Sequence, residues 1–302
     1  MTFNIINKKP FSLRGLKATF INMPLRETAT PNTPPEGPLI LAAILRRLDA
    51  EVHLLDLNAY RIKDKLSEKR GMPNGRHMTY GETRDMLAKH IENAGDQDLI
   101  AFSGKITTLR WQEEVAKIVK SLQPECFLVT GNGLATEIKQ GLFNWIPELD
   151  AIGRSEGDNI IVDIAKDSMI IKEKGMKKAI ASGMLSRAYA GEINGRHRFI
   201  YEGGRPNDLD DIPYGALDLL EEDPYGYNVL EDYIKVPVWG IAANNSSATP
   251  FNMKRSLTTV SSRGCPYACA FCYRGSQGER NYGMRSCEHI AKQVRGYVDR
   301  YN

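Results

Sequence analysis

The sequence lacks any apolar run that approaches the roughly 18 residues a membrane-spanning helix requires. It also lacks a run of lysines or arginines of the kind that grips phosphates, and its formal net charge of +3 is too mild to argue for nucleic acid. Residues 1–20 have neither a long apolar core nor a small-residue cleavage site, so we expect no secretory signal. These absences exclude neither enzymes nor binding proteins, but they disfavour membrane-spanning and nucleic-acid-binding proteins.

Cysteine is scarce, and its distribution is uneven. The 302 residues include five cysteines, and three of them, Cys265, Cys269 and Cys272, lie in the stretch SSRGCPYACAFCYRG at 261–275. We refer to these three as the cysteine motif. Such usage does not suggest a secreted disulfide framework. It fits a reducing cytoplasm, where clustered thiols bind metal or carry out redox chemistry, and we therefore predict a cytoplasmic protein.

The first half of the chain alternates short apolar runs with amphipathic stretches. Strands are predicted at 17–22, 51–57, 98–104, 125–131 and 149–154, and helices at 37–50, 80–95, 109–123, 135–143 and 158–167. Alternation of this kind implies an α/β fold in which helices cover both faces of a parallel sheet. We predict a doubly wound, five-strand, Rossmann-like domain over residues 1–168.

Two further segments follow this domain. Residues 169–255 are rich in glycine, proline and aspartate, which predicts an irregular connector with one hairpin around 188–203. Residues 256–302 begin with a β-rich stretch, continue into the cysteine motif and end in a predicted helix at 286–302. Ser286 is the expected N-cap of that helix, and Glu288 lies in its first turn.

The spacing of the cysteine motif is C-x3-C-x2-C, and thiolates are ligands for soft metals and iron–sulfur clusters. Three thiolates can hold three irons of a cubane cluster and leave the fourth iron open to a chelating molecule. Gly264 and Pro266 allow a tight turn, and Phe271 can shield a cluster from water. One alternative is a structural zinc site in which Cys287 is the fourth ligand. Cys126, inside a predicted strand, is expected to be a buried structural residue.

The stretch RGCPYACAFC, which follows a β-rich segment, resembles the signature of the radical S-adenosylmethionine (SAM) superfamily. The resemblance implies that Cys265, Cys269 and Cys272 hold a 4Fe-4S cluster, and that Phe271 lies next to the adenine of SAM. It also implies reductive cleavage of SAM to a 5′-deoxyadenosyl radical, with a flavodoxin or ferredoxin as electron donor. Residues 256–302 would then be the first βα unit of a partial (β/α) barrel.

The segments 33–58, 150–161 and 208–220 resemble the N-terminal pattern, the Gly-Glu-Gly stretch and the connector of the cobalamin-binding radical SAM class. In doubly wound sheets, ligands bind at the carboxyl ends of the strands. The cobalamin pocket would be built from Ser103, Gly104, Thr130, Gly131, Gly133, Ser155, Glu156 and Gly157. Any of the glycines could instead serve only to make a tight turn.

One departure from that class concerns cobalt. Many of its members carry a cobalt-ligating histidine after the first strand, but here that stretch reads INMPLRETATPNTPPEG and has none. His53 lies within a predicted strand and reads as a packed or edge residue. A nucleotide-binding Rossmann domain is the main rival, but GNGLAT at 131–136 has only two of the fingerprint glycines and follows the fourth predicted strand.

The sequence thus predicts the N-terminal portion of a cobalamin-dependent radical SAM enzyme that acts on a small molecule or natural product, by methyl transfer or rearrangement. A lone βα unit cannot bury both faces of a parallel strand. We therefore expect the barrel to be truncated, residues 256–302 to be poorly supported, and this chain alone to be inactive. The alternative is a non-catalytic cobalamin- or nucleotide-binding module with a structural zinc site.

Overall fold

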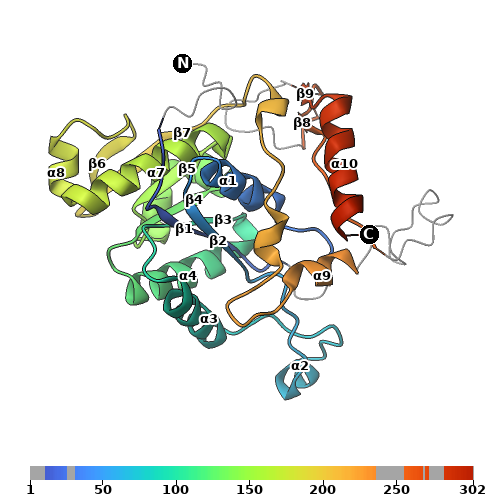
Figure 1. The fold of residues 1–302 in the computed structure, drawn as a ribbon. Helices are drawn as coiled ribbons and strands as arrows, with labels where there is room; N and C mark the ends of the chain where they lie inside the picture. The colour runs from blue at the N-terminus through green and yellow to red at the C-terminus, as the bar shows by residue number, and fades with distance from the viewer. Residues whose placement is uncertain (1–10, 26–30, 236–254, 268, 272–281, 302) are drawn as a thin grey trace.

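The computed structural model describes all residues except 1–10, 26–30, 236–254, 268, 272–281 and 302. Within the described part, a seven-stranded sheet lies at the centre in the order β2-β1-β3-β4-β5-β7-β6 (Figure 1). Its strands are β1 (Lys17–Asn22), β2 (Glu51–Asp56), β3 (Leu99–Ser103), β4 (Phe127–Gly131), β5 (Ala151–Arg154), β6 (Tyr189–Ile193) and β7 (Arg196–Glu202). Neighbouring strands of this sheet pair in parallel, except that β6 and β7 are antiparallel. The predicted α/β fold with a largely parallel sheet is confirmed.

Helices cover both faces of the sheet, which explains why its central strands are apolar on both sides. The helices are α1 (Glu36–Arg46), α2 (Lys65–Lys69), α3 (Tyr80–Ala94), α4 (Leu109–Leu122), α5 (Asn132–Ile138), α6 (Leu142–Trp145), α7 (Gly157–Lys174), α8 (Met176–Ala181), α9 (Val229–Ile234) and α10 (Cys287–Tyr301). Helices α1 and α7 pack on one face through residues such as Ile44 and Ile164. Helices α3 and α4 pack on the other through residues such as Leu87 and Val119. The sheet is therefore doubly wound.

The sheet has two more strands than the five that the sequence predicted. The hairpin expected around 188–203 is present, and its two-residue turn, Asn194–Gly195, has positive φ at both positions (54° and 72°), as a primed hairpin turn requires. Strand β7 pairs in parallel with β5 and buries Phe199 and Tyr201 against the sheet. The hairpin assigned to an irregular connector is therefore part of the sheet, because its apolar side chains extend the core.

The later part of the connector is also tied to the sheet. The Tyr233 hydroxyl of α9 donates a hydrogen bond of 2.5 Å to the Asp56 carboxylate at the end of β2. Asp56 also accepts hydrogen bonds from the Asn22 side chain (2.7 Å) and the Asn58 backbone N–H (3.0 Å). Desolvation raises the pKa of this buried carboxyl above its ordinary value. These hydrogen bonds fix the short helix α9 next to the strand ends.

The C-terminal segment differs in detail from a regular βα unit. The observed strand β8 (Ser262–Gly264) is short and pairs in antiparallel fashion with β9 (Tyr282–Met284). The backbone N–H groups of Ser256 and Val260 bond to the Ile234 carbonyl and the Glu36 carboxylate, so they are not part of a strand ladder. This explains why the β-rich stretch from 256 forms only a short strand.

Helix α10 matches the helix expected at 286–302. The Ser286 hydroxyl accepts a hydrogen bond from the His289 backbone N–H (3.1 Å), which is the expected N-cap contact, and Glu288 lies in the first turn. The helix lies apart from the sheet, on the far side of α1 in Figure 1. Gln293 is the one buried residue that the structure describes in α10, and Tyr297 and Tyr301 are partly buried against the core, so this helix has few core contacts of its own.

Candidate functional site

A cavity of about 340 Å³ lies at the carboxyl ends of the parallel strands. Sheets of this strand order bind ligands at this edge, near the point between β1 and β3 where the winding reverses. Residues from β1, β3, β4 and β5 form its floor, and the N-terminal turns of α1 and α7 form its sides. Its apolar wall includes Phe20, Ile40, Leu41, Ile160, Ile161 and Ile164. The volume is within the range of small-molecule sites.

The loops around the cavity are held together by side-chain hydrogen bonds. Asn132 follows β4 with φ of 77°, and its amide donates to the Ser103 hydroxyl at the end of β3 (2.9 Å). Ser155 follows β5 with φ of 62°, and its backbone N–H donates to the Thr136 hydroxyl (2.9 Å). Left-handed backbone at non-glycine residues is uncommon and is found where the surrounding structure enforces it. The three strand-end loops therefore form one connected rim.

Most of the residues predicted for a cobalamin pocket lie at this cavity. Those that line it are Ser103, Thr130, Gly131, Ser155, Glu156 and Gly157. Gly104 and Gly133 do not line it. A Cβ at Gly104 would lie 2.1 Å from the Gln112 amide nitrogen, so this glycine allows close packing against α4. Gly133 donates its backbone N–H to the Asn132 side chain in the first turn of α5.

Further residues line the cavity that the sequence did not single out. Gly153 in β5 is one of them, and a Cβ there would lie 3.1 Å from the Ile160 side chain in the apolar wall. Glu36 at the start of α1 and Asp158 at the start of α7 are two others. Desolvation is the largest influence on Glu36 and raises the pKa of its carboxyl. An acidic residue in the first turn of a helix that follows a strand was the sequence signal that could have singled out Glu36 and Asp158.

The segment that leads into the cysteine motif forms part of the same cavity wall. Val260 and Arg263 both line the cavity. The Arg263 guanidinium donates two hydrogen bonds to the Asp158 carboxylate (2.6 and 3.2 Å) and one to the Glu156 carboxylate (3.1 Å). Arg263 lies two positions before Cys265, so a direct ion pair connects the cysteine-bearing segment to the rim of the sheet.

Two of the three motif cysteines, Cys265 and Cys269, are described, and both thiols are exposed. Cys272 lies outside the described residues, so the predicted three-cysteine ligand set stays a prediction. Among the residues that are described, no three cysteine, histidine, aspartate or glutamate side chains are grouped closely enough to hold a metal ion. Phe271 is 91% exposed. The described part of the motif is therefore exposed, and it follows two residues, Val260 and Arg263, that line the cavity.

Cys126 and His53 are placed as structural residues. Cys126 is buried, and desolvation raises the pKa of its thiol to about 12, which makes it unreactive. In the described part of the chain, no histidine lines the cavity. His53 lies on the edge strand β2 and contacts Glu51 (3.1 Å). Neither His53 nor Cys126 is placed to take part in the site.

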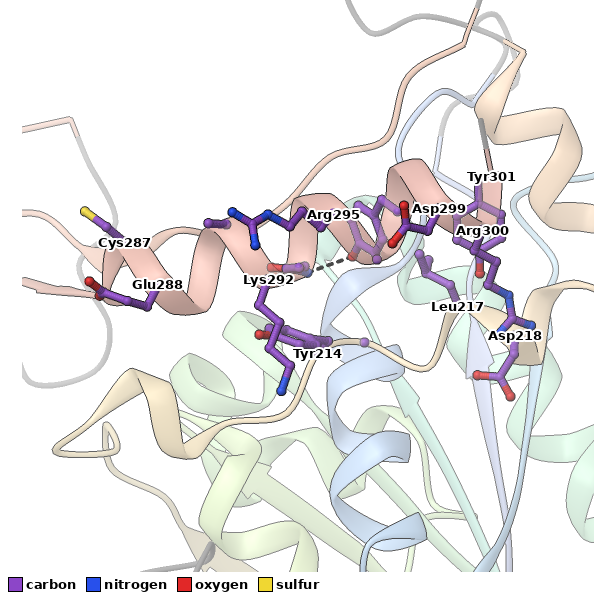
Figure 2. Close-up of a pocket in the computed structure, with 15 residues that line it drawn as sticks. Tyr214, Leu217, Asp218, Cys287, Glu288, Lys292, Arg295, Asp299, Arg300 and Tyr301 are labelled. Atoms are coloured by element: carbon purple, nitrogen blue, oxygen red, sulfur yellow. Dashed lines mark hydrogen bonds between the residues drawn. The ribbon is translucent and has the colours of Figure 1, made fainter.

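A second, more open groove of about 900 Å³ lies between α10 and residues 214–218. Figure 2 shows α10 along one side of this groove and Tyr214, Leu217 and Asp218 along the other, with Cys287 at its far end. Charged side chains of both signs line the groove, and it touches none of the strand ends. The cavity at the sheet edge is therefore the better candidate site.

The chain shares sequence similarity with a methyltransferase. No protein-family model matches the chain. An uncharacterized methyltransferase of Pyrococcus horikoshii is 25% identical over 210 residues, which cover 69% of this chain and 38% of that protein. The chain therefore matches well under half of its relative's length. In the described part of the chain, no helix is long and apolar enough to cross a membrane.

Proposed function

We propose that this chain is the N-terminal portion of a cobalamin-dependent radical SAM enzyme, with methyl transfer as the favoured reaction and rearrangement as the other. The observation that carries the proposal is the C-x3-C-x2-C motif of Cys265, Cys269 and Cys272, which follows a segment that lines a cavity at the sheet edge. The similarity to a methyltransferase supports methyl transfer over rearrangement.

The residues around the motif fit a 4Fe-4S cluster. The described thiols, Cys265 and Cys269, are exposed and thus accessible to iron. Gly264 has φ of 89°, a left-handed conformation that lets the chain turn sharply just before the first cysteine. Such a cluster, with SAM on its open iron, would supply one-electron cleavage of SAM to a 5′-deoxyadenosyl radical, given an electron donor such as flavodoxin or ferredoxin.

The cavity fits part of a cobalamin in chemical character. Its depth is aliphatic and aromatic, whereas its rim offers serine and threonine hydroxyls, backbone groups at glycines such as Gly131 and Gly157, and the carboxylates of Glu36 and Glu156. Apolar walls with a few convergent polar groups are typical of cofactor sites. The rim carboxylates can accept hydrogen bonds from amide N–H groups. Since no described histidine lines the cavity, cobalt would have no histidine ligand from these residues.

The chain's own residues would then hold two cofactors close together and exclude water between them. The apolar wall excludes water from the cavity, and Val260 and Arg263 close one side of it, immediately before the cysteine motif. The substrate, a small molecule or natural product, would be bound with the help of residues outside this chain. We expect this chain alone to bind cofactors without turning over substrate.

The test is anaerobic reconstitution with iron and sulfide, followed by iron counting and electron paramagnetic resonance of the reduced protein with and without SAM. About four irons per chain are expected, as in a 4Fe-4S cluster, with a signal that changes on adding SAM. The triple variant Cys265→Ala, Cys269→Ala, Cys272→Ala should take up no cluster, whereas the matched variant Cys126→Ala should take it up normally.

Two results would change the proposal. One zinc per chain, with no uptake of iron, would replace radical chemistry by the alternative of a binding module with a structural zinc site, and Cys287→Ala should then release the zinc. A cluster whose signal ignores SAM would show that residues beyond this chain are needed for SAM binding. A longer protein would be required to test the radical step.

A further inference from the structure

The cavity and the cysteine motif are connected by one side chain, Arg263. Its guanidinium is bound to Asp158 and Glu156, which both line the cavity, and its backbone lies two positions before Cys265. We propose that Arg263 is a positioning residue that couples ligand binding in the cavity to metal binding by the cysteine motif. This inference rests on the proposed function, because it assumes that both sites bind a cofactor.

The geometry of the ion pair makes it specific. Arg263 uses two nitrogens to bind both oxygens of Asp158, the fork arrangement that arginine forms with carboxylates and lysine does not. The Asp158 side chain is 3% exposed and that of Arg263 is 17% exposed. Loss of one partner would leave a charge buried without its counter-ion, which is costly.

A second contact fixes the same segment at its other end. The Val260 backbone N–H donates to the Glu36 carboxylate in the first turn of α1 (3.1 Å). The 260–263 segment is thus attached to the N-terminal turns of α1 and α7, which stand on two sides of the cavity. One side of the cavity exists only when this segment is in place.

Coupling follows from this shared wall. A cluster bound by the cysteine motif would restrict the residues just before Cys265 and so keep Arg263 on Asp158. A ligand in the cavity would then meet a completed wall and bind more tightly. By linkage, the ligand must strengthen metal binding by the same factor. Metal loading should strengthen ligand binding, because Arg263 and Val260 complete the wall of the cavity and do not occupy its interior.

The experiment measures the dissociation constant of hydroxocobalamin for the protein before and after anaerobic loading with iron and sulfide. In the wild type, loading should tighten binding on the order of tenfold, a usual size for coupling between sites. In Arg263→Gln the effect of loading should disappear, and in Arg263→Lys, which keeps the charge but not the fork, it should be reduced. The matched control is Arg205→Gln, because Arg205 pairs with the same Glu156 (3.6 Å) from outside the 260–263 segment.

A second readout needs no ligand in the cavity. Iron loading should slow backbone hydrogen exchange at residues 155–160 in the wild type and in Arg205→Gln, but not in Arg263→Gln. If hydroxocobalamin fails to bind while this exchange effect is present, the cobalamin part of the proposed function fails and the coupling stands. If loading leaves exchange unchanged, weakens cobalamin binding, or acts equally in Arg263→Gln, the coupling role of Arg263 is wrong.

Discussion

A methyl group added at Gly131 offers a direct test of whether the cavity is the cofactor site. Gly131 lies at the end of β4 and lines the cavity. Its φ is −136°, an extended conformation that alanine adopts freely. A Cβ at this position would have the Gly153 carbonyl oxygen, at 3.6 Å, as its nearest neighbour, which is an ordinary van der Waals contact. The folded protein should therefore accept Gly131→Ala.

Gly131→Ala should change the free energy of unfolding less than it changes the free energy of ligand binding. Replacing glycine where alanine fits stabilises a protein by about 0.4–1 kcal/mol, and loss of glycine at the N-cap of α5 offsets part of this gain. The free energy of unfolding should thus change by less than about 1 kcal/mol. A ligand that fills the cavity would meet the added methyl group, and overpacking costs about 1–3 kcal/mol. That cost corresponds to a loss of roughly 5- to 140-fold in affinity.

The assay is an absorbance titration of hydroxocobalamin, accompanied by thermal unfolding of each protein. Gly81→Ala is the control, because Gly81 lies in α3 and a Cβ there would meet only the Thr79 hydroxyl at 3.8 Å. It should bind like the wild type. If Gly131→Ala unfolds at the wild-type temperature and binds cobalamin with unchanged affinity, then cobalamin does not occupy this cavity.

Three further predictions concern single side chains. Cys265→Ala should abolish iron uptake without a change in melting temperature, because its thiol is exposed. Cys126→Ala should keep iron uptake and lose stability, because its thiol is buried. Equal iron content in the two variants would contradict the assignment of the motif. Tyr233→Phe should lower the free energy of unfolding in urea by about 1.5–3 kcal/mol, the usual worth of a hydrogen bond to a charged group, and no measurable loss would mean that Asp56 finds another donor. The Glu82 carboxylate pairs with a buried arginine, which lowers its pKa from 4.5 to about 2. A carboxyl whose pKa is lowered on folding stabilises the fold above pH 4.5, and that stabilisation fades as the pH falls towards 2. In urea titrations, the difference in free energy of unfolding between wild type and Glu82→Gln should therefore shrink from pH 4.5 to about 2. A constant difference would argue against the ion pair.

The sequence predicted the positions of strands and helices better than it predicted which strands pair. The predicted strand at 17–22 coincides with β1, and the predicted helix at 109–123 ends one residue beyond α4. Local patterns were sufficient there because apolar spacing reports directly on burial. The partner of β7 was not predictable in this way. In the sheet, Phe199 of β7 packs against Phe127 of β4 (5.4 Å between ring centroids), which is a contact between distant parts of the chain.

In the candidate site too, residues that the fold class places were predictable, whereas contacts between distant parts of the chain were not. Strand-end residues such as Thr130 and Glu156 were predicted because the fold class itself places ligands at that edge. Arg263 was part of the quoted cysteine stretch, but nothing in its neighbourhood indicates a partner 105 positions earlier in the chain, at Asp158. The pattern predicted Gly104 as a ligand-binding glycine. In the structure, a side chain at this position would collide with Gln112, which explains the glycine without a ligand.

The pairing of β7 with β5 has a practical consequence for dissecting the protein. A fragment that stops at residue 168 would lack β7 and would present β5, with Ala151 and Ile152 fully buried in the intact sheet, as a bare apolar edge. Exposed edges of this kind recruit strands from other molecules and promote aggregation. A soluble version of the N-terminal unit should therefore extend at least through α9, so that both the hairpin and the Tyr233 anchor to β2 are retained.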